Sequence, residues 1–282
     1  AKTGMTYTGS AQAANTATVS PDAGGTITYT YYTNNGCSAG ATTTAPTNAG
    51  DYWVKASVAA VTNKTNAASS SCVAHSIAKK AVTVTAASQS RAWNNSALTN
   101  SGCTGSGLVS GHTVTCTMTS ASTITTAGSV DNVISTTTIK SGSTDVTSNY
   151  EVTTAKGTLT VTLATPTVSL TAKETTWTGS AIAANTATVS PDAGGTITYT
   201  YYTNSGCTTQ TTTSHGASAS GGAPSLGGQY YVKATAAAVA NKTNAASSSC
   251  VSHKINAATP TVSLSAKTGM TYTGSAQAAN TA

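Results

Sequence analysis

Hydrophobic and polar residues alternate along much of the chain, and this alternation predicts short β-strands. In the segment TITYTYY, Ile27, Tyr29 and Tyr31 fall on one face and the threonines fall on the other. The same period of two recurs in residues 112–118 and 158–163. It places successive side chains on opposite faces of a strand. Runs such as PDAGG and TNNG separate these segments and favour turns. No window of eleven residues shows a helical stripe, so we expect an all-β fold.

Composition narrows the class of protein further. Only 7% of the 282 residues are charged, and the chain has no Phe, whereas about 25% are charged in an average globular chain. Such a chain has too few Leu, Glu, Lys and Arg to build amphipathic helices. The formal net charge of +6 is spread thinly, with Lys79-Lys80 as the one adjacent basic pair. We therefore expect no nucleic-acid partner, because binding needs a concentrated basic patch. No stretch approaches the roughly 18 apolar residues of a transmembrane helix, so we expect no membrane span in this segment.

Repeats dominate the organisation of the chain. Residues 1–17 recur unchanged as residues 266–282, an offset of 265 residues. Within this period, AANTATVSPDAGGTITYTYYTN and NKTNAASSSCV each occur twice, at offsets of 170 and 178 residues. The second copy therefore carries an insertion around TTTSHGASASGG, a composition typical of a surface loop. We interpret the chain as a window of a longer tandem array, and we expect both of its ends to interrupt a module.

The repeats predict an array of small β-sandwich modules. Two similar units, here called the A-type repeats, flank a different unit, here called the B-type repeat. The motif TPTVSL at 165–170 opens the second A-type repeat and returns at 259–264. The segments that connect the units are short: TLATPTVSL and NAATPTVSL contain a single Pro each, and IAKKAVTVT contains no Gly, which favours stiff linkers. The expected boundaries are 1–80 for the first A-type repeat, 81–163 for the B-type repeat, 164–257 for the second A-type repeat and 258–282 for the start of the next repeat.

The first A-type repeat lacks the opening strand that the motif TPTVSL would supply. A sandwich without an edge strand exposes unpaired backbone groups and part of its apolar face. We expect Val262 and Leu264 to form an inter-module strand that fills this place in the module that follows. A continuous chain would make this contact in cis, and separate subunits would make it in trans.

Several segments resemble the tandem Ig-like repeats of giant bacterial surface proteins, of the YDG type and the "mostly β-grasp" type. In the first A-type repeat these are YTGSAQ, TITYTYYT, APTNAGDYWVKASV and SIAKK. The B-type repeat resembles the sister repeat, although WNN at 93–95 stands where that family has YDG. The resemblance implies Ig-like modules in an extracellular array that serves as a stalk, adhesin or fibre. It implies no catalytic site.

Each repeat contains two cysteines, and this even distribution predicts disulfides within the units. The six candidates are Cys37, Cys72, Cys103, Cys116, Cys207 and Cys250. The alternative is zinc, because Cys72 and Cys250 are each followed three residues later by a histidine, His75 and His253. Residues i and i+3 of a strand point to opposite faces, however, so we favour disulfides and buried histidines and expect no cofactor.

We find no pattern that indicates an enzyme. The acidic residues are scattered, and no nucleophile elbow, phosphate-binding loop or paired carboxylates occur. Lys55 and Lys233 recur in VKA; an isopeptide crosslink is conceivable there, but a solvated lysine on an outer face is the simpler interpretation. Asn63, Asn94 and Asn241 stand in glycosylation sequons.

Two functions remain. The first is a structural, non-enzymatic segment of an extracellular filament or cell-surface stalk, which gives reach, stiffness and self-association; its partners would be copies of itself, end to end or side by side. The alternative is an adhesin module that binds glycans or a host protein through its repeat surface. Tyr32 and Tyr202 are the best candidates for that surface, because they break the phase of the tyrosine-rich strands.

Overall fold

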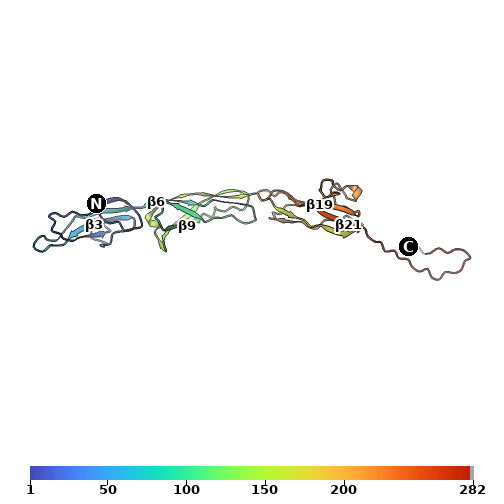
Figure 1. Ribbon diagram of the computed structural model, residues 1–282, viewed down its shortest axis with the longest axis horizontal. Coiled ribbons are helices and arrows are strands. Elements are labelled where there is room, and N and C mark those ends of the chain that lie inside the picture. Colours follow the sequence, from blue (N-terminus) through green and yellow to red (C-terminus); the bar gives the residue numbers. More distant parts are fainter. Residues whose placement is uncertain (280–282) are drawn as a thin grey trace. The chain divides into compact units, whose positions relative to one another are not determined.

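Figure 1 shows a computed structural model of the chain, which describes residues 1–279. Residues 280–282, the end of the segment expected to open the next repeat, lie outside the described residues. Strands dominate, and the helical elements of residues 1–279 are two 3₁₀ turns of three residues each. The expectation of an all-β chain is confirmed. The chain forms two compact units: one contains Ala1–Ala92 and Ser96–Thr162, and the other contains Trp93–Asn95 and the chain from Leu163 on.

The first A-type repeat forms one five-stranded sheet in the order β1-β5-β3-β2, with β4 paired to β3. Strand β1 runs parallel to β5, and the other pairs are antiparallel. Its strands are β1 Lys2–Thr6, β2 Ile27–Tyr32, β3 Gly50–Val58, β4 Ala68–Ser69 and β5 Val73–Ala78.

The B-type repeat forms three three-stranded sheets in the orders β13-β6-β8, β12-β11-β9 and β10-β14-β7. Its elements are β6 Lys80–Ala86, β7 Gln89–Ala92, β8 Cys103–Ser106, β9 His112–Met118, β10 Gly128–Asn132, β11 Ile134–Ser141, β12 Thr144–Asp145, the 3₁₀ helix η1 Thr147–Asn149, β13 Tyr150–Ala155 and β14 Gly157–Thr162.

One hydrophobic core runs through the first unit. Val82 and Val84 of β6 pack with Ile139 of β11, so two sheets of the B-type repeat face each other. Tyr7 and Ile77 of the A-type repeat belong to the same cluster. The alternation of buried valines with exposed threonines along β6 follows the period of two in its sequence.

The junction between the two repeats of this unit is short and hydrogen-bonded. Only one residue separates the end of β5 from the start of β6. The buried Asn149 bridges the repeats: its Oδ1 accepts a hydrogen bond from the Ala49 N–H at 2.8 Å, and its Nδ2 donates to Asn48 Oδ1 at 3.1 Å. Tyr7 also packs edge-on against Tyr150, with ring centroids 5.5 Å apart. These contacts fix the first A-type repeat against the B-type repeat.

The second unit repeats the sheet order of the first A-type repeat and adds one small sheet. The order is β16-β21-β19-β18, with β20 paired to β19, and the addition is the antiparallel pair β15-β17. Its elements are β15 Thr167–Ser169, β16 Lys173–Thr176, β17 Thr188–Ser190, β18 Ile197–Tyr202, the 3₁₀ helix η2 Thr213–His215, β19 Gly228–Ala236, β20 Ala246–Ser247 and β21 Val251–Asn256. The helix η2 lies in the eight-residue insertion. After β21 the described chain carries no further strand (Figure 1).

Asn149→Ala should destabilise the first unit. The change leaves the partly buried Ala49 N–H without its acceptor, which costs up to about 1–3 kcal/mol. Urea unfolding of the full chain should show a lower midpoint for the transition of this unit. Asn48→Ala is the matched control, because Asn48 is exposed and loses only its hydrogen bond to Asn149. Equal effects of the two changes would show that Asn149 does not fix the junction.

Candidate functional site

The six cysteines form three disulfides, each between two cysteines of one repeat. Cys37–Cys72 and Cys207–Cys250 stand at matching places in the two A-type repeats, with Cα–Cα distances of 5.9 and 6.0 Å. Cys103–Cys116 joins β8 to β9 in the B-type repeat, with a Cα–Cα distance of 6.2 Å. In the chain-entropy model, closing loops of this size stabilises each repeat by about 3–4 kcal/mol. That contribution is large for repeats with few large apolar side chains.

In the two Cys-x-x-His segments, the cysteine forms a disulfide and the histidine is a buried core residue. Cys72 and Cys250 are disulfide-bonded, so their sulfurs are not free thiolates that could bind zinc. Across residues 1–279, no group of three or more His, Cys, Asp or Glu side chains is placed to hold a metal ion. His75 and His253 are completely buried, on β5 and β21.

Each buried histidine packs edge-on against a tyrosine. The ring centroids of His75 and Tyr31 lie 5.3 Å apart, and those of His253 and Tyr201 lie 5.2 Å apart. The His75 Nε2–H donates to the carbonyl oxygen of Gln12 at 2.9 Å. Burial lowers the pKa of both histidines below the usual 6.5, because it disfavours the charged ring. Both are therefore neutral core residues at pH 7.

The tyrosine-rich strands use most of their hydroxyl groups inside the fold. The Ala17 N–H donates to Tyr29 Oη at 2.7 Å, and the Ala14 N–H donates to Tyr31 Oη at 2.9 Å. The same two contacts recur in the second A-type repeat. Tyr32 and Tyr202 are half-buried. The rows of tyrosines that the alternative function invokes are thus largely structural.

An open groove lies along residues 17–20 of the first A-type repeat. It has a volume of about 250 Å³, and a second hollow of about 170 Å³ continues it and shares Ala17 and Ala56. Within the described chain, residues 18–20 belong to no strand. The lining of the open groove alternates apolar with hydroxyl side chains; the apolar ones are Ala17, Val19, Ile27, Ala56, Val58 and Ala68, and the others are Thr18, Ser20, Ser57, Ser69 and Ser70. The fold thus leaves part of the apolar face of β3 uncovered.

The matching face of the second A-type repeat is covered by β15. This strand pairs with β17; Val168 in β15 and Leu170 directly after it are 7% and 8% exposed. They form one cluster with Ala187, Ala234 and Ala236, among others. Ala187 and Ala234 correspond to Ala17 and Ala56 of the open groove. The opening strand of an A-type repeat therefore closes the face that the first repeat leaves open.

A further copy of that strand sequence lies after β21 and is exposed. The seven residues ATPTVSL at 258–264 are identical to residues 164–170. Val262 is 78% exposed and Leu264 is 62% exposed. Both side chains named from the sequence as an inter-module strand are thus free of the core of the second unit.

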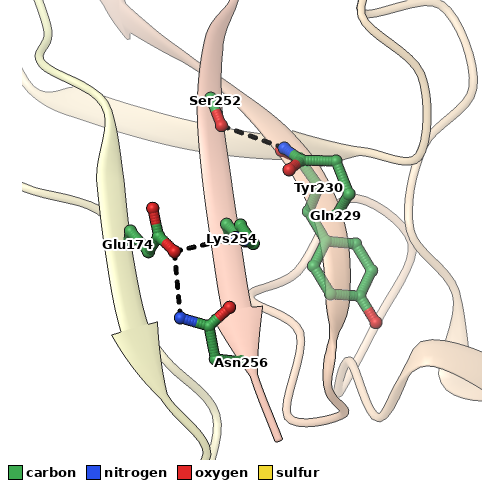
Figure 2. Close-up of polar contacts among 6 residues, drawn as sticks. All are labelled: Glu174, Gln229, Tyr230, Ser252, Lys254 and Asn256. Atoms are coloured by element: carbon green, nitrogen blue, oxygen red, sulfur yellow. Dashed lines mark hydrogen bonds and ion pairs between the residues drawn. The ribbon is translucent and has the colours of Figure 1, made fainter.

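Figure 2 shows how Glu174 attaches β16 to β21. Its Oε1 accepts hydrogen bonds from Lys254 Nζ at 2.8 Å and from Asn256 Nδ2 at 3.0 Å. The contact with Lys254 holds the pKa of the Glu174 carboxyl below its usual value. On the other side of β21, Gln229 Nε2 in β19 donates a hydrogen bond to Ser252 Oγ in β21 at 2.9 Å. The carboxylate is exposed, and both of its contacts are to residues of β21, so it ties the two parallel strands together.

Other polar candidates from the sequence also have local roles. Asp22 and Asp192 each accept a hydrogen bond from the backbone two residues on, at 2.8 Å, and so close the PDAGG turns. Lys55 and Lys233 lie in β3 and β19, half-buried, opposite threonines of the neighbouring strand. Of the sequons, Asn63 and Asn241 occupy turns with positive φ.

Two features escaped the sequence analysis. Asn149 carries no local signal, because the segment TSNY reads as an ordinary turn. The lining of the open groove was also not identified, because it joins residues 17–20 to residues 56–58 and 68–70, which no local pattern brings together.

No protein-family model and no curated protein sequence matches the chain. Among solved structures, Drosophila N-cadherin EC1-4 is similar at 11% identity and a TM-score of 0.25, over 83% of this chain and 68% of that chain. Drosophila N-cadherin EC1-3 is similar at 10% identity and a TM-score of 0.24, over 89% of this chain and 95% of that chain. At TM-scores this low, neither similarity bears on the function of the chain.

We expect all six cysteines to be oxidised in the purified protein. The intact mass should lie about 6 Da below the value for the reduced chain, since each disulfide removes two hydrogens. Peptide mapping without reduction should find each crosslink within one repeat. Free thiols, or crosslinks between repeats, would contradict this arrangement.

The buried histidines should make stability depend on pH. Their pKa values are lowered in the folded state, so below pH 6.5 the unfolded chain binds protons that the folded chain does not. Stability should therefore be full above pH 6.5 and fall as the pH drops, by at most about 1.4 kcal/mol per pH unit for each histidine. The measurement is urea unfolding between pH 7 and pH 5.

The double variant His75→Gln/His253→Gln is the comparison for this experiment. It keeps a side-chain donor for the Gln12 carbonyl and removes the titrating rings. Its unfolding free energy should change less with pH over the same range. An unchanged slope would show that other groups cause the pH dependence.

Proposed function

We propose that this chain is a structural, non-enzymatic segment of an extracellular filament or cell-surface stalk. In this proposal the repeats are tandem Ig-like β-sandwich modules with short, stiff linkers, and they give reach, stiffness and self-association. The observation that carries it is the exact repetition of residues 1–17 at 266–282, together with the internal repetition of the A-type unit. A tandem array needs this kind of periodicity, and a binding or catalytic domain does not.

The junction inside the first unit supports the stiffness of such an array. The two repeats share one core, and a single residue separates β5 from β6. Asn149 and Tyr150 add a hydrogen bond and a ring contact across the junction. A linker of this length leaves little freedom for the repeats to move apart.

The disulfides support an oxidising location. All three disulfides are compatible with a secreted or extracellular protein. None of the helices within residues 1–279 is long and apolar enough to cross a membrane. In the proposal the segment stands outside the cell, and copies of itself are its main partners.

The adhesin function has weaker support. Most of the tyrosine hydroxyls that could face a sugar ring hold the backbone of residues 14–17 or its counterpart. In these two strands, Tyr32 and Tyr202 remain as half-buried surface candidates.

The proposal is tested on cells that produce the protein. Antibodies against the purified chain, with immunogold electron microscopy, should label extracellular filaments or stalks with an axial period that matches the sequence repeat. Label confined to the cytoplasm, or spread without any filament, would contradict the proposal. Specific binding of the purified chain to a glycan array, lost in Tyr32→Ala/Tyr202→Ala, would favour the adhesin function instead.

A further inference from the structure

We propose that the edge of β2 that faces away from β3, here called the free edge, is a self-association surface. There, β2 of a second copy of this chain pairs with it and joins the two sheets into one. This deepens the proposed function, on which it rests, by naming the surface through which copies join side by side. Because the partner is the same strand, the contact is symmetric, and each copy contributes the same edge.

Strand β2 lies at the end of its sheet, in the order β1-β5-β3-β2, and β3 is its neighbouring strand. In an antiparallel pair, the backbone groups of alternate residues point to opposite sides of the strand. Tyr31 shows which set points to the free edge. Its N–H donates to the Thr42 carbonyl at 2.7 Å, and its carbonyl accepts from the Thr42 N–H at 3.0 Å. Ile27 and Tyr29 have the same parity as Tyr31, so their backbone groups point the same way.

The segment that pairs with Tyr31 does not continue along the free edge. After its bridge with Tyr31 the chain bends at Thr43, and the Thr44 N–H donates to Thr42 Oγ1 at 3.1 Å. Within residues 1–279, the N–H and C=O groups of Ile27 and Tyr29 make no hydrogen bond. A row of unpaired backbone groups on an edge strand is a template for a strand of another chain.

The same edge is free in the second A-type repeat. Strand β18 has the sequence of β2 and also ends its sheet, in a repeat that contains the pair β15-β17. The backbone of Tyr201 is paired with residues 211 and 221, whereas Ile197 and Tyr199 make no backbone hydrogen bond on that side within the described chain. The free edge is therefore a property of the A-type repeat, whether or not the opening strand is in place.

The eight-residue insertion makes β2 the less obstructed of the two edges. In the second repeat, Gly221 of the inserted loop lies against the side chain of Thr200, which is the counterpart of Thr30. The first repeat has no such loop. We therefore assign the contact to β2.

Strand β2 lacks the features by which proteins usually block edge pairing. Its sequence, ITYTYY, contains no charged residue and no Pro, and its register with β3 runs without a bulge. Lys55, opposite Thr30, belongs to β3 and is one strand away from the free edge. Charged side chains, Pro and bulges are the common protection of an edge strand. Threonine, isoleucine and tyrosine also favour strand pairing.

One register pairs the free groups of β2 with those of its copy. Ile27 faces Tyr29 of the partner, Tyr29 faces Ile27, and each pair exchanges N–H···O=C bonds in both directions. The two copies of Thr28 then face each other on the two-fold axis, as a non-hydrogen-bonded pair. A register centred on Ile27 would instead place Tyr29 opposite Gly25, which lies outside the strand.

The intermolecular ladder ends where Thr30 faces Thr26 of the partner, because Thr42 occupies the place beside Tyr31. The partner chain reaches its β2 through the turn at Gly24, which has a φ of 79° and open space where a side chain would stand. Such a turn lets the chain leave the edge before it meets Thr42. Strand addition of this kind combines backbone hydrogen bonds with cross-strand side-chain pairs.

A crosslink on the two-fold axis tests the contact directly. The full chain with Thr28→Cys is oxidised mildly, and dimers are separated by size. Facing residues of a non-hydrogen-bonded antiparallel pair lie about 4.5 Å apart at Cα, within the range of a disulfide. The expected result is a dimer in which one crosslinked peptide joins the two new cysteines. Failure of this variant to form the dimer would overturn the proposal.

The matched control is Thr26→Cys, on the same face of the chain near the start of β2. In the proposed register Thr26 faces Thr30 of the partner, so Thr26→Cys alone should form few dimers. A mixture of chains with Thr26→Cys and chains with Thr30→Cys should form mixed dimers. Equal dimer formation by Thr28→Cys and Thr26→Cys, each alone, would show random collision and overturn the proposal.

Self-association of the full chain provides the second readout. Sedimentation velocity at rising concentration should show association of the native sequence. Thr28→Lys should weaken it by at least about tenfold, because it places like charges opposite each other on the axis.

Thr16→Lys is the control for charge, because Thr16 is exposed and belongs to no strand. This variant should associate like the native sequence, and equal losses in the two lysine variants would overturn the proposal. Both experiments use purified chains, so their failure is distinguishable from the absence of extracellular filaments on cells.

Discussion

The structure depends on one constraint: an apolar sheet face and the free edge of a strand must be covered by another strand. Helices that could cover a face are missing from the described chain, and large apolar side chains are few. Valines and small residues alternate with threonines, so each face buries a narrow strip rather than a thick core. A single short strand therefore decides whether an A-type repeat is closed. The contrast between β15 and the open groove follows from this dependence.

Covalent and polar contacts compensate for the thin core within each repeat. Each repeat contains one disulfide. In each A-type repeat, a buried histidine packs in the interior beside a tyrosine. Hydroxyl groups of tyrosines hold the irregular segment that follows the first strand. These hydroxyls accept from partly buried backbone N–H groups of a segment that belongs to no strand. The repeated polar residues thus serve the fold in both copies.

The burial of apolar surface also joins the two repeats of the first unit to each other. In the first unit, Tyr7 and Ile77 of one repeat and Val82 of the next lie in a single cluster, so the two repeats share one core. At this boundary the Asn149 side chain accepts one hydrogen bond and donates another to the first A-type repeat. The two bonds fix the orientation of the two repeats as well as their contact. Repeats that complete each other in this way depend on their neighbours for stability, which is the behaviour of an array rather than of separate domains. This is why we favour a structural role over recognition.

The sequence by itself determined the local structure: the period of two in segments such as residues 112–118 predicted strands, PDAGG predicted turns, and the repeated blocks revealed matching units. These features depend on neighbours in sequence, since side-chain direction and turn propensity are local. It also led to the prediction, so far untested, that Val262 and Leu264 form an inter-module strand. Only the tertiary structure decided that β1 runs parallel to β5, that Asn149 closes a junction and which side chains line the open groove. Those features join residues up to about a hundred positions apart, and no local pattern specifies which strands become neighbours.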